Sequence, residues 1–406
     1  MVVYLDHAAT TPMIPEAIEA YTDAMRQVGN PASIHSQGQS AKRMLEEARE
    51  VIASSLGCDP IEVVLTSGGT ESINLALKGI YWKRNADATR PVILAPGGEH
   101  HATIDTLEWL EKHEGAHIAW LPLDDEGSVD PAAVERALAE HGSRVALITL
   151  LWANNEVGTI QPITEIAALA AAHDVPLHVD AVAAYGYLPI DFAAVRRASG
   201  STGNAGLVGL SISAHKVGGP VGIGALVVSR SAAVEPLLHG GGQQRQVRSG
   251  TQDVAGTVAF AVAARQADAR LAVEPARLTA LRDRVIDGVL VAVPSARLNG
   301  PTGDRRLPGN AHFAFPGCEG DSLLFLLDMA GVSVSTGSAC QAGIPEPSHV
   351  LRAMGRSELD ARGALRVTLG HSTTDADVDA LLAAVPQAYA QAARAGLSDR
   401  TTALGS

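Results

Sequence analysis

The chain has 406 residues, of which 46% are hydrophobic and 18% are charged, a composition typical of a globular protein with length enough for two domains. Its 31 basic and 44 acidic side chains give a net charge of −13, which argues against binding to nucleic acid or to a membrane surface. We therefore expect a small-molecule partner. The start lacks a signal-peptide pattern and the most apolar run, VALITLLWA, is too short to span a bilayer, so we expect a cytoplasmic protein.

The chain contains three cysteines, Cys58, Cys318 and Cys340. Their number is odd and their spacing is not that of metal ligands, so the sequence favours neither a disulfide framework nor a metal site. Each thiol has to be judged by its surroundings.

Residues 60–230 alternate short apolar runs with amphipathic stretches, as in EVVLTSGGTESINLALKGI and VILAPGGEHHATIDTLEWLEKH. Continuous apolar strands followed by helices predict an α/β fold with a mostly parallel sheet covered by helices on both faces. Ligands of such sheets bind at the carboxyl ends of the strands. Polar clusters follow the predicted strands at those ends, at residues 67–71, 99–101, 154–156, 180 and 213–216.

A long helical stretch over about 254–290 leads into a second region. Its strand-like pieces, NAHFAFPG and GVSVSTGS, and its helix, DADVDALLAAVPQAYAQAARA, predict a smaller α+β domain. We expect a large domain over 15–260, a small domain formed by 1–14 with 261–390, and a polar, disordered tail over 391–406.

The segment TSGGTES places a glycine pair between a strand and the first turn of a helix. Free N–H groups at Gly68 and Gly69, together with the Thr70 hydroxyl, could hold a phosphate there. Taken alone, a glycine turn at such a junction is as often only a turn.

Asp180 ends an apolar strand in HVDAV, and His100 lies in GGEHHAT. A carboxylate in that position either caps a turn or holds the nitrogen of a bound ring. The imidazole could stack on a flat cofactor, although a loop histidine or a metal cluster would show the same pattern. Neither residue decides the matter alone.

Lys216 follows an apolar run and precedes five glycines in SAHKVGGPVGIGALVV. A surface amine is the usual interpretation of a single lysine. In a site of low dielectric constant, however, the pKa of the amine falls and the neutral amine can form a Schiff base with a carbonyl. A phosphate cradle, a carboxylate, an aromatic platform and a lysine together are what pyridoxal phosphate requires.

Several motifs, in family order from about Tyr4 to Val385, resemble those of the cysteine desulfurases, in the class V group of fold-type I pyridoxal-phosphate enzymes. They are YLDHAATTP, GNPASIHSQG, TSGGTESINLALKG, NNEVG, HVDA, SAHKVGGPVGIGAL, GGGQQRQVRSGT and STGSACQAGIPEPSHVLRAMG. The resemblance implies a seven-stranded-type sheet in the large domain and a catalytic cysteine in the small domain, on the extended loop of one group of this family.

The resemblance also implies roles around the cofactor ring. Lys216 would join the cofactor, Asp180 would pair with its ring nitrogen, and His100 would stack on the ring and act in catalysis. Asn155 would lie near the phenolic oxygen and the substrate. Phosphate binding is implied for Gly69, Thr70, Ser213 and His215, with Thr251 reaching in from the other subunit of a homodimer.

Cys340 lies in STGSACQAG, where small residues predict a mobile loop that lets a thiolate approach the cofactor. The alternative is a small buried hydrophobic residue, the usual state of a free cysteine. Arg366, in ALRVTLG, could clamp a substrate carboxylate through two parallel hydrogen bonds, or form an ordinary surface ion pair. The position of Arg366 in the family favours the clamp.

The implied activity converts L-cysteine to L-alanine and leaves the sulfur on Cys340 as a persulfide. The sulfur would then pass to an acceptor protein for iron-sulfur cluster assembly or tRNA thiolation. The alternatives are a selenocysteine lyase, another class V activity such as an aminotransferase, or a non-catalytic binding partner. An aminotransferase needs no thiol, and a non-catalytic relative has no need of Lys216, Asp180 and Cys340.

The chain departs from the family at two positions. Ala183, in HVDAVAAYG, stands where the family commonly has a glutamine that hydrogen bonds to the phenolic oxygen of the cofactor. Gln243, in GGGQQR, stands where a histidine is frequent. We expect these departures to affect the rate and the spectrum more than the class of reaction.

Overall fold

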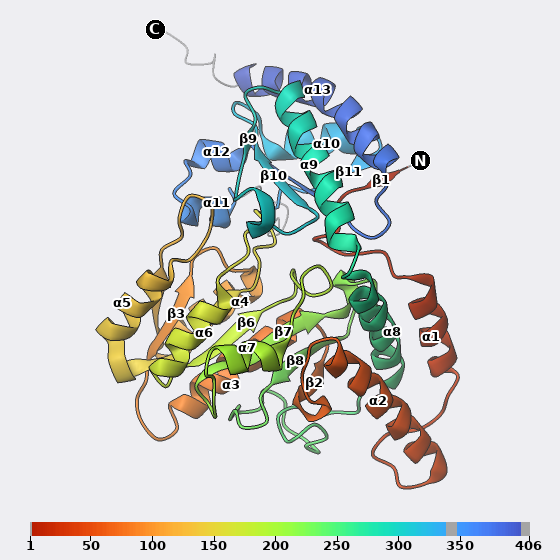
Figure 1. Ribbon diagram of the computed structural model, residues 1–406, viewed down its shortest axis with the longest axis vertical. Coiled ribbons are helices and arrows are strands. Elements are labelled where there is room, and N and C mark those ends of the chain that lie inside the picture. The colour runs from red at the N-terminus through yellow and green to blue at the C-terminus, as the bar shows by residue number, and fades with distance from the viewer. Residues whose placement is uncertain (1, 338–346, 399–406) are drawn as a thin grey trace.

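The computed structural model describes residues 2–337 and 347–398, and their side chains as far as residue 394 (Figure 1). The large sheet consists of β2 (Val63–Thr66), β3 (Val92–Pro96), β4 (His117–Leu121), β5 (Val145–Leu151), β6 (Pro176–Asp180), β7 (Gly206–Ser213) and β8 (Gly224–Val228). Their order across the sheet is β2-β8-β7-β6-β5-β3-β4. Only β8 runs antiparallel to its neighbours.

Both faces of this sheet are buried, which explains why its strands are continuous apolar runs. Along β3, Val92 and Leu94 belong to one apolar core, whereas Ile93 and Ala95 belong to a second core on the opposite face. Successive side chains of a strand point to opposite faces, so a strand with alternate residues in two cores has no polar face. The mostly parallel sheet predicted from the sequence is confirmed.

Helices cover both faces of the sheet. One face is covered by α1 (Pro15–Met25), α2 (Ser36–Ser54), α5 (Pro131–His141), α6 (Ile163–Ala172), α7 (Phe192–Ala198) and α8 (Val254–Arg270). The other is covered by α3 (Gly69–Arg84) and α4 (His101–Glu114). Several helices begin at an aspartate that accepts a first-turn N–H bond, as Asp130, Asp191 and Asp253 do.

The small domain, in the upper part of Figure 1, has its own apolar core. Its strands are β1 (Val3–Tyr4), β9 (Arg297–Leu298), β10 (Asn310–Ala314), β11 (Val332–Ser333) and β12 (Ala364–Thr368). Its helices are α9 (Glu274–Ala292), α10 (Gly320–Met329), α11 (His349–Ala353), α12 (Glu358–Arg362) and α13 (Asp375–Ser398). The sheet β12-β10-β9 is antiparallel, and β1 pairs in parallel with β11. Within the described ranges, no helix combines the length and the low polarity that a bilayer crossing requires.

Two expected boundaries are corrected by the structure. Helix α8 packs in the large core as far as Ala267, so the chain changes core between α8 and α9 rather than at residue 260. Helix α13 continues to Ser398, so the segment 391–398 is helical instead of disordered. The reason is that Ala392, only 1% exposed, still packs on the core of the small domain. Residues 399–406 of the expected tail lie outside the described residues.

Candidate active site

A cavity of about 400 Å³ lies where the strands of the large sheet end. Its walls bring together nine of the residues expected from the sequence: Gly69, Thr70, His100, Asn155, Asp180, Ser213, His215, Lys216 and Arg366. They come from segments spread over some three hundred positions of the chain. Its other walls are Ala8, Ala9, Ile73, Leu151, Val182, Ala183, Ser335 and Gly337.

The start of helix α3 forms one end of the cavity. Gly68, the N-cap, has a φ of +147°, which favours glycine, and a Cβ on the facing Gly224 would lie 2.7 Å from its Cα. The helix begins at Gly69, so its first N–H groups point toward the cavity end without helical partners. Ser213, buried at the end of β7, has an Oγ for which the described residues provide no hydrogen-bond partner. Free N–H groups beside a free hydroxyl form a site for an anion.

Asp180 is both a turn-capping residue and a wall of the cavity. Its Oδ1 accepts a hydrogen bond from the N–H of Val182 at 2.9 Å, and its side chain is almost fully buried. Burial raises the pKa of Asp180 to about 6, although the Lys216 charge and the Val182 hydrogen bond oppose that rise. Such a carboxylate can hold a proton on a neighbouring ring nitrogen.

His100 lines the cavity at the start of helix α4. Its Nδ1 accepts the N–H of Ala102 at 3.0 Å, and desolvation by the cavity walls together with the Lys216 charge lowers its pKa to about 4. The ring is therefore neutral at pH 7, and the hydrogen bond assigns its proton to Nε2. A neutral imidazole can lie against an aromatic ring and still offer an N–H donor.

Lys216 ends a short 3₁₀ turn that follows β7. Its Nζ donates hydrogen bonds to the backbone oxygens of Ala8 and, at 2.7 Å, of Ala9. Burial, and then the nearby Arg366 cation, lower the pKa of this amine to about 8. A lysine with its amine in water would keep the ordinary pKa of about 10.4, whereas Lys216 lines the cavity and bonds there to the N-terminal segment.

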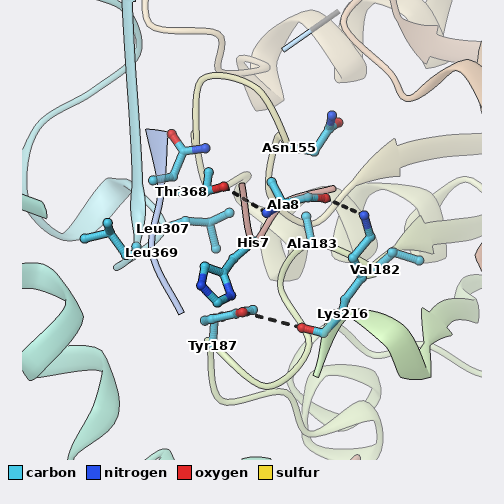
Figure 2. A pocket seen from close by; sticks show the side chains of 12 residues that line it. His7, Ala8, Asn155, Val182, Ala183, Tyr187, Lys216, Leu307, Thr368 and Leu369 are labelled. Atoms are coloured by element: carbon cyan, nitrogen blue, oxygen red, sulfur yellow. Dashed lines mark hydrogen bonds between the residues drawn. The ribbon is translucent and has the colours of Figure 1, made fainter. Parts of the chain in front are cut away.

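A second, smaller cavity of about 40 Å³ lies beside Lys216 (Figure 2). Figure 2 shows the Lys216 side chain reaching Ala8, while the Tyr187 hydroxyl donates to the backbone oxygen of Lys216 at 3.4 Å. From the opposite side Thr368 Oγ1 accepts the N–H of Ala8 at 2.9 Å. The segment around Ala8 therefore lies between the two domains and contacts both.

Arg366, in the centre of β12, is brought to the same cavity from the small domain. Its Nη1 donates to the backbone oxygen of Asn155 at 2.9 Å, and its Nη2 donates to Asp6 Oδ1 at 3.0 Å. The guanidinium is almost fully buried, and its Nε has no partner within the described parts of the chain. It thus keeps free N–H groups with which it could bind a carboxylate.

The sequence reasoning missed the contribution of the N-terminal segment to this site. Asp6, Ala8 and Ala9 contact Arg366 and Lys216, which follow them by 207 to 360 positions. These residues belong to the motif YLDHAATTP, whose composition does not indicate a position beside the lysine.

Comparison with known proteins identifies the family. Residues 3–381 match the model of the Aminotransferase class-V family. The chain belongs to the class-V aminotransferases. Among its relatives in this family, an IscS-like cysteine desulfurase of Mycobacterium tuberculosis is 52% identical over 97% of this chain and 98% of its own length. A cysteine desulfurase IscS of Dictyoglomus turgidum is 42% identical over 93% of this chain and 92% of its own length.

The solved structure of a NifS-like protein has the same fold as this class-V chain. It superimposes with a TM-score of 0.86 and 31% sequence identity, and it covers 96% of this chain and 100% of its own. The cysteine desulfurase family and the α/β fold that the resemblance implied are therefore both confirmed.

A class-V member is expected to bind pyridoxal phosphate, and the cavity fits this cofactor. The unpartnered Ser213 hydroxyl and the start of helix α3 match its phosphate, and the buried Asp180 matches its ring nitrogen. The low pKa of Lys216 makes the amine available to an aldehyde. The cavity thus has residues suited to both the phosphate end and the ring end of the cofactor.

One expected residue of this class-V site is not part of the cavity walls, and a second lies outside the described residues. Thr251 is exposed outside the cavity, and Cys340 lies outside the described residues. Of the remaining thiols, Cys318 is buried with a pKa raised to about 11, and burial with nearby carboxylates raises the pKa of Cys58 to about 12. Thiols with such high pKa values are poor nucleophiles at pH 7. Across the described residues, no group of three or more His, Cys, Asp or Glu side chains could hold a metal.

The structure places both residues that depart from the family pattern, Ala183 and Gln243. Ala183 lines both cavities, so the residue that replaces the family glutamine does face the site. Gln243 is exposed, and its Oε1 accepts the N–H of Gly250 at 2.8 Å. Gln243 therefore closes the loop that leads to Thr251.

Proposed function

We propose that this cysteine desulfurase uses pyridoxal phosphate to convert L-cysteine to L-alanine, and that Cys340 takes up the sulfur as a persulfide. One observation supports this proposal above all. A single cavity is lined by a lysine of lowered pKa, an anion site at the start of helix α3, a buried carboxylate, and an arginine whose Nε has no hydrogen-bond partner among the described residues. The sulfur then passes to an acceptor protein for iron-sulfur cluster assembly or tRNA thiolation.

The residues of the large domain hold the cofactor. Gly69, Thr70, Ser213 and His215 bind its phosphate, Asp180 keeps a proton on its ring nitrogen, and His100 packs against the ring. Asn155 lies toward the phenolic oxygen. When bound, pyridoxal phosphate supplies a ring that withdraws electrons from the α-carbon of an attached amino acid.

Lys216 joins the cofactor in the resting enzyme and afterwards moves the α-proton of the substrate. The pKa of about 8 supports this role, because an amine whose pKa lies close to pH 7 can both accept and return a proton at that pH. Arg366 binds the carboxylate of L-cysteine with the N–H groups that Asp6 and Asn155 leave free. This orients the α-carbon toward Lys216.

The short separation in sequence between Cys340 and a residue of the cavity wall supports Cys340 as the acceptor. Gly337 lines the cavity and Cys340 follows it by three residues, which span at most about 11 Å. In the transfer, the C–S bond of L-cysteine breaks and an S–S bond to Cys340 forms. The β-carbon gains the hydrogen that completes L-alanine, so the carbon is reduced while sulfur is oxidised, and no outside oxidant is needed.

A Cys340→Ser variant tests this proposal. We expect normal cofactor binding and a normal spectral response to L-cysteine, with alanine formation lowered by about a thousandfold or more because the nucleophile is absent. Cys58→Ser and Cys318→Ser are the controls and should form alanine at the rate of the unmodified protein, because both thiols have raised pKa values. Alanine formation by Cys340→Ser at the normal rate would refute the role of Cys340.

The rival functions give different results in the same assay. A selenocysteine lyase would release selenide from L-selenocysteine much faster than sulfur from L-cysteine, and a non-catalytic relative would form alanine from neither. A class-V aminotransferase would convert L-cysteine without forming alanine.

We also propose a homodimer, in which each cavity receives Thr251 from the partner chain. The support is that Thr251 is exposed and lies outside the cavity of its own chain, in a loop that Gln243 closes. Sedimentation velocity gives the mass in solution, and a monomer that retains full cofactor affinity would contradict the proposal.

A further inference from the structure

Glu156, in the NNEVG motif, is buried beside the cavity but has no part in the function proposed above. Its backbone is fixed on both sides. The N–H donates to Asn154 Oδ1 at 2.9 Å, and the carbonyl oxygen accepts from Asn310 Nδ2 at 2.9 Å. These bonds hold the backbone of Glu156 between a turn of the large domain and strand β10 of the small domain.

Ser348 of the small domain bonds to this carboxylate, and Gly337 lies close to it. The hydroxyl of Ser348, which is 1% exposed, donates to Glu156 Oε2 at 2.5 Å. Gly337 packs against the same oxygen, since a Cβ at Gly337 would lie 3.3 Å from Oε2 and 3.2 Å from His312 Nε2. Gly337 also has a φ of +89°, so a side chain there would strain the backbone as well.

Gly337 and Ser348 are separated by ten residues, and Cys340 is one of them. Most of that segment, 338–346, lies outside the described residues. Its two flanking residues nevertheless meet at a single carboxylate. Wherever the segment itself runs, its two ends start from the same fixed point next to Asn155.

The Ser348 end has further links to the cofactor cavity. Ser348 Oγ accepts the N–H of Leu351 at 3.2 Å and so caps helix α11. His349 Nε2 hydrogen bonds to the backbone oxygen of Glu99 at 2.7 Å, and Glu99 directly precedes His100. These bonds therefore connect the Ser348 end of the segment that carries Cys340 to the part of the cavity wall at His100.

We propose that Glu156 is a positioning residue for sulfur transfer, which acts by holding the Ser348 end of the segment that carries Cys340 close to its Gly337 end. The inference rests on the proposed role of Cys340 as the sulfur acceptor. Holding the two ends of a tether close together restricts the volume that a group on the tether explores and so raises its effective concentration nearby. Glu156 touches neither substrate nor cofactor in this scheme, so its loss slows the transfer and leaves the binding of both unchanged.

Ser348→Ala in the holoenzyme is the first test, because it removes the donor and leaves Glu156 in place. The matched control is Ser357→Ala, which removes the same kind of N-cap from the neighbouring five-residue helix α12, where Ser357 Oγ accepts from the N–H of Asp360 at 3.1 Å. In a single turnover with L-cysteine, mass spectrometry follows the persulfide on Cys340. We expect Ser348→Ala to form it about tenfold or more slowly, the scale of one lost hydrogen bond to a charged group. Ser357→Ala should form it at the normal rate.

The spectral titration with L-cysteine separates positioning from a general structural effect. We expect cofactor content and the affinity for L-cysteine to stay within twofold of normal in both serine variants. If Ser348→Ala loses cofactor or substrate affinity in proportion to its loss of transfer, the contact is merely structural and the proposal fails.

Glu156 itself gives a graded series. Glu156→Gln keeps an acceptor oxygen for Ser348, so it should transfer sulfur faster than Glu156→Ala, and the effects of Ser348→Ala and Glu156→Gln should not add. If the persulfide of the unmodified protein resides on Cys340 but Ser348→Ala forms it at the normal rate, only this inference fails. If the persulfide resides on another cysteine, the proposed function fails and the inference falls with it.

Discussion

The cavity has two walls, and they are built differently. The large-domain wall consists of Thr70, His100, Asp180, Ser213 and Lys216, each placed at the end of a strand or the start of the following helix. The small-domain wall consists of Ser335, Gly337 and Arg366, which lie in or beside the short strands of the small domain. The residues of the first wall are placed by strands of one sheet and by the turns or helices that follow them, and Lys216 among them also bonds to a distant segment, at Ala8 and Ala9. The second wall depends mainly on contacts with distant parts of the chain.

The two walls also differ in the roles that their residues have in the proposed function. In the proposed function, the anion cradle, the carboxylate and the lysine that would hold the cofactor all come from the large sheet and the turns at its edge, although Lys216 also bonds to Ala8 and Ala9. In the proposed function, the small-domain wall adds Arg366, which would bind the carboxylate of the substrate. Arg366 keeps its position through Asp6 and Asn155, and Gly337 packs on Glu156. Variants of the two walls should therefore fail in different ways.

The largest effect is expected at Lys216. Lys216→Ala should abolish the visible absorbance of the bound cofactor and all alanine formation, because the covalent link to the cofactor is lost. Borohydride reduction followed by peptide mass mapping should label Lys216 alone in the unmodified protein. Lys78, whose Nζ lies 4.2 Å from the Trp109 ring centroid and whose pKa burial also lowers, is the matched control and should stay unlabelled. Retained visible absorbance in Lys216→Ala would mean that another amine holds the cofactor.

A smaller, selective effect is expected at Arg366. Arg366→Ala should weaken binding of L-cysteine to the holoenzyme by about a hundredfold, through loss of hydrogen bonds to a charged carboxylate. Cysteamine, which has the amine and thiol of cysteine but no carboxylate, should bind equally well to both proteins. Spectral titration with each ligand measures both affinities. An equal loss for cysteamine would show that Arg366 supports the fold of the site rather than recognising the substrate.

The smallest expected effect is the pH dependence of cofactor attachment to the apoprotein. Only the neutral Lys216 amine attacks an aldehyde, and its pKa is lowered to about 8, first by burial and then by Arg366. The neutral fraction rises with pH, from about one-tenth at pH 7 to about one-half at pH 8, so the rate should rise about fivefold over that interval and level off above about pH 9.

Stopped-flow absorbance after mixing with pyridoxal phosphate measures this rate, with propylamine as the control for ionisations of the cofactor itself. A rate that keeps rising tenfold per pH unit through pH 10 would mean that Lys216 has the pKa of a solvated amine. In that case the enclosure of the lysine by the large-domain wall would have no chemical effect.

Most of the large-domain wall was predictable from the sequence. Thr70, Asp180, Ser213 and Lys216 each follow an apolar strand, and parallel strands bring their carboxyl ends to the same edge of a sheet. The site of Asp180 also shows why the alternatives could not be separated from sequence: the carboxylate caps a turn at Val182 and lines the cavity at once. Arg366 was identified only through the resemblance, because a strand-like run does not tell which element it will pair with.

The sequence by itself determined the sheet, the helices on its faces and the set of polar residues at its edge, because periodicity and strand ends are local properties of the chain. Only the tertiary structure decided that Asp6 pairs with Arg366 and that the backbone oxygens of Ala8 and Ala9 accept hydrogen bonds from Lys216. The same is true of the approach of Gly337 and Ser348 to Glu156. These contacts join residues up to 360 positions apart. Their partners are chosen by the packing of one domain against the other, and no local pattern in the sequence specifies that packing.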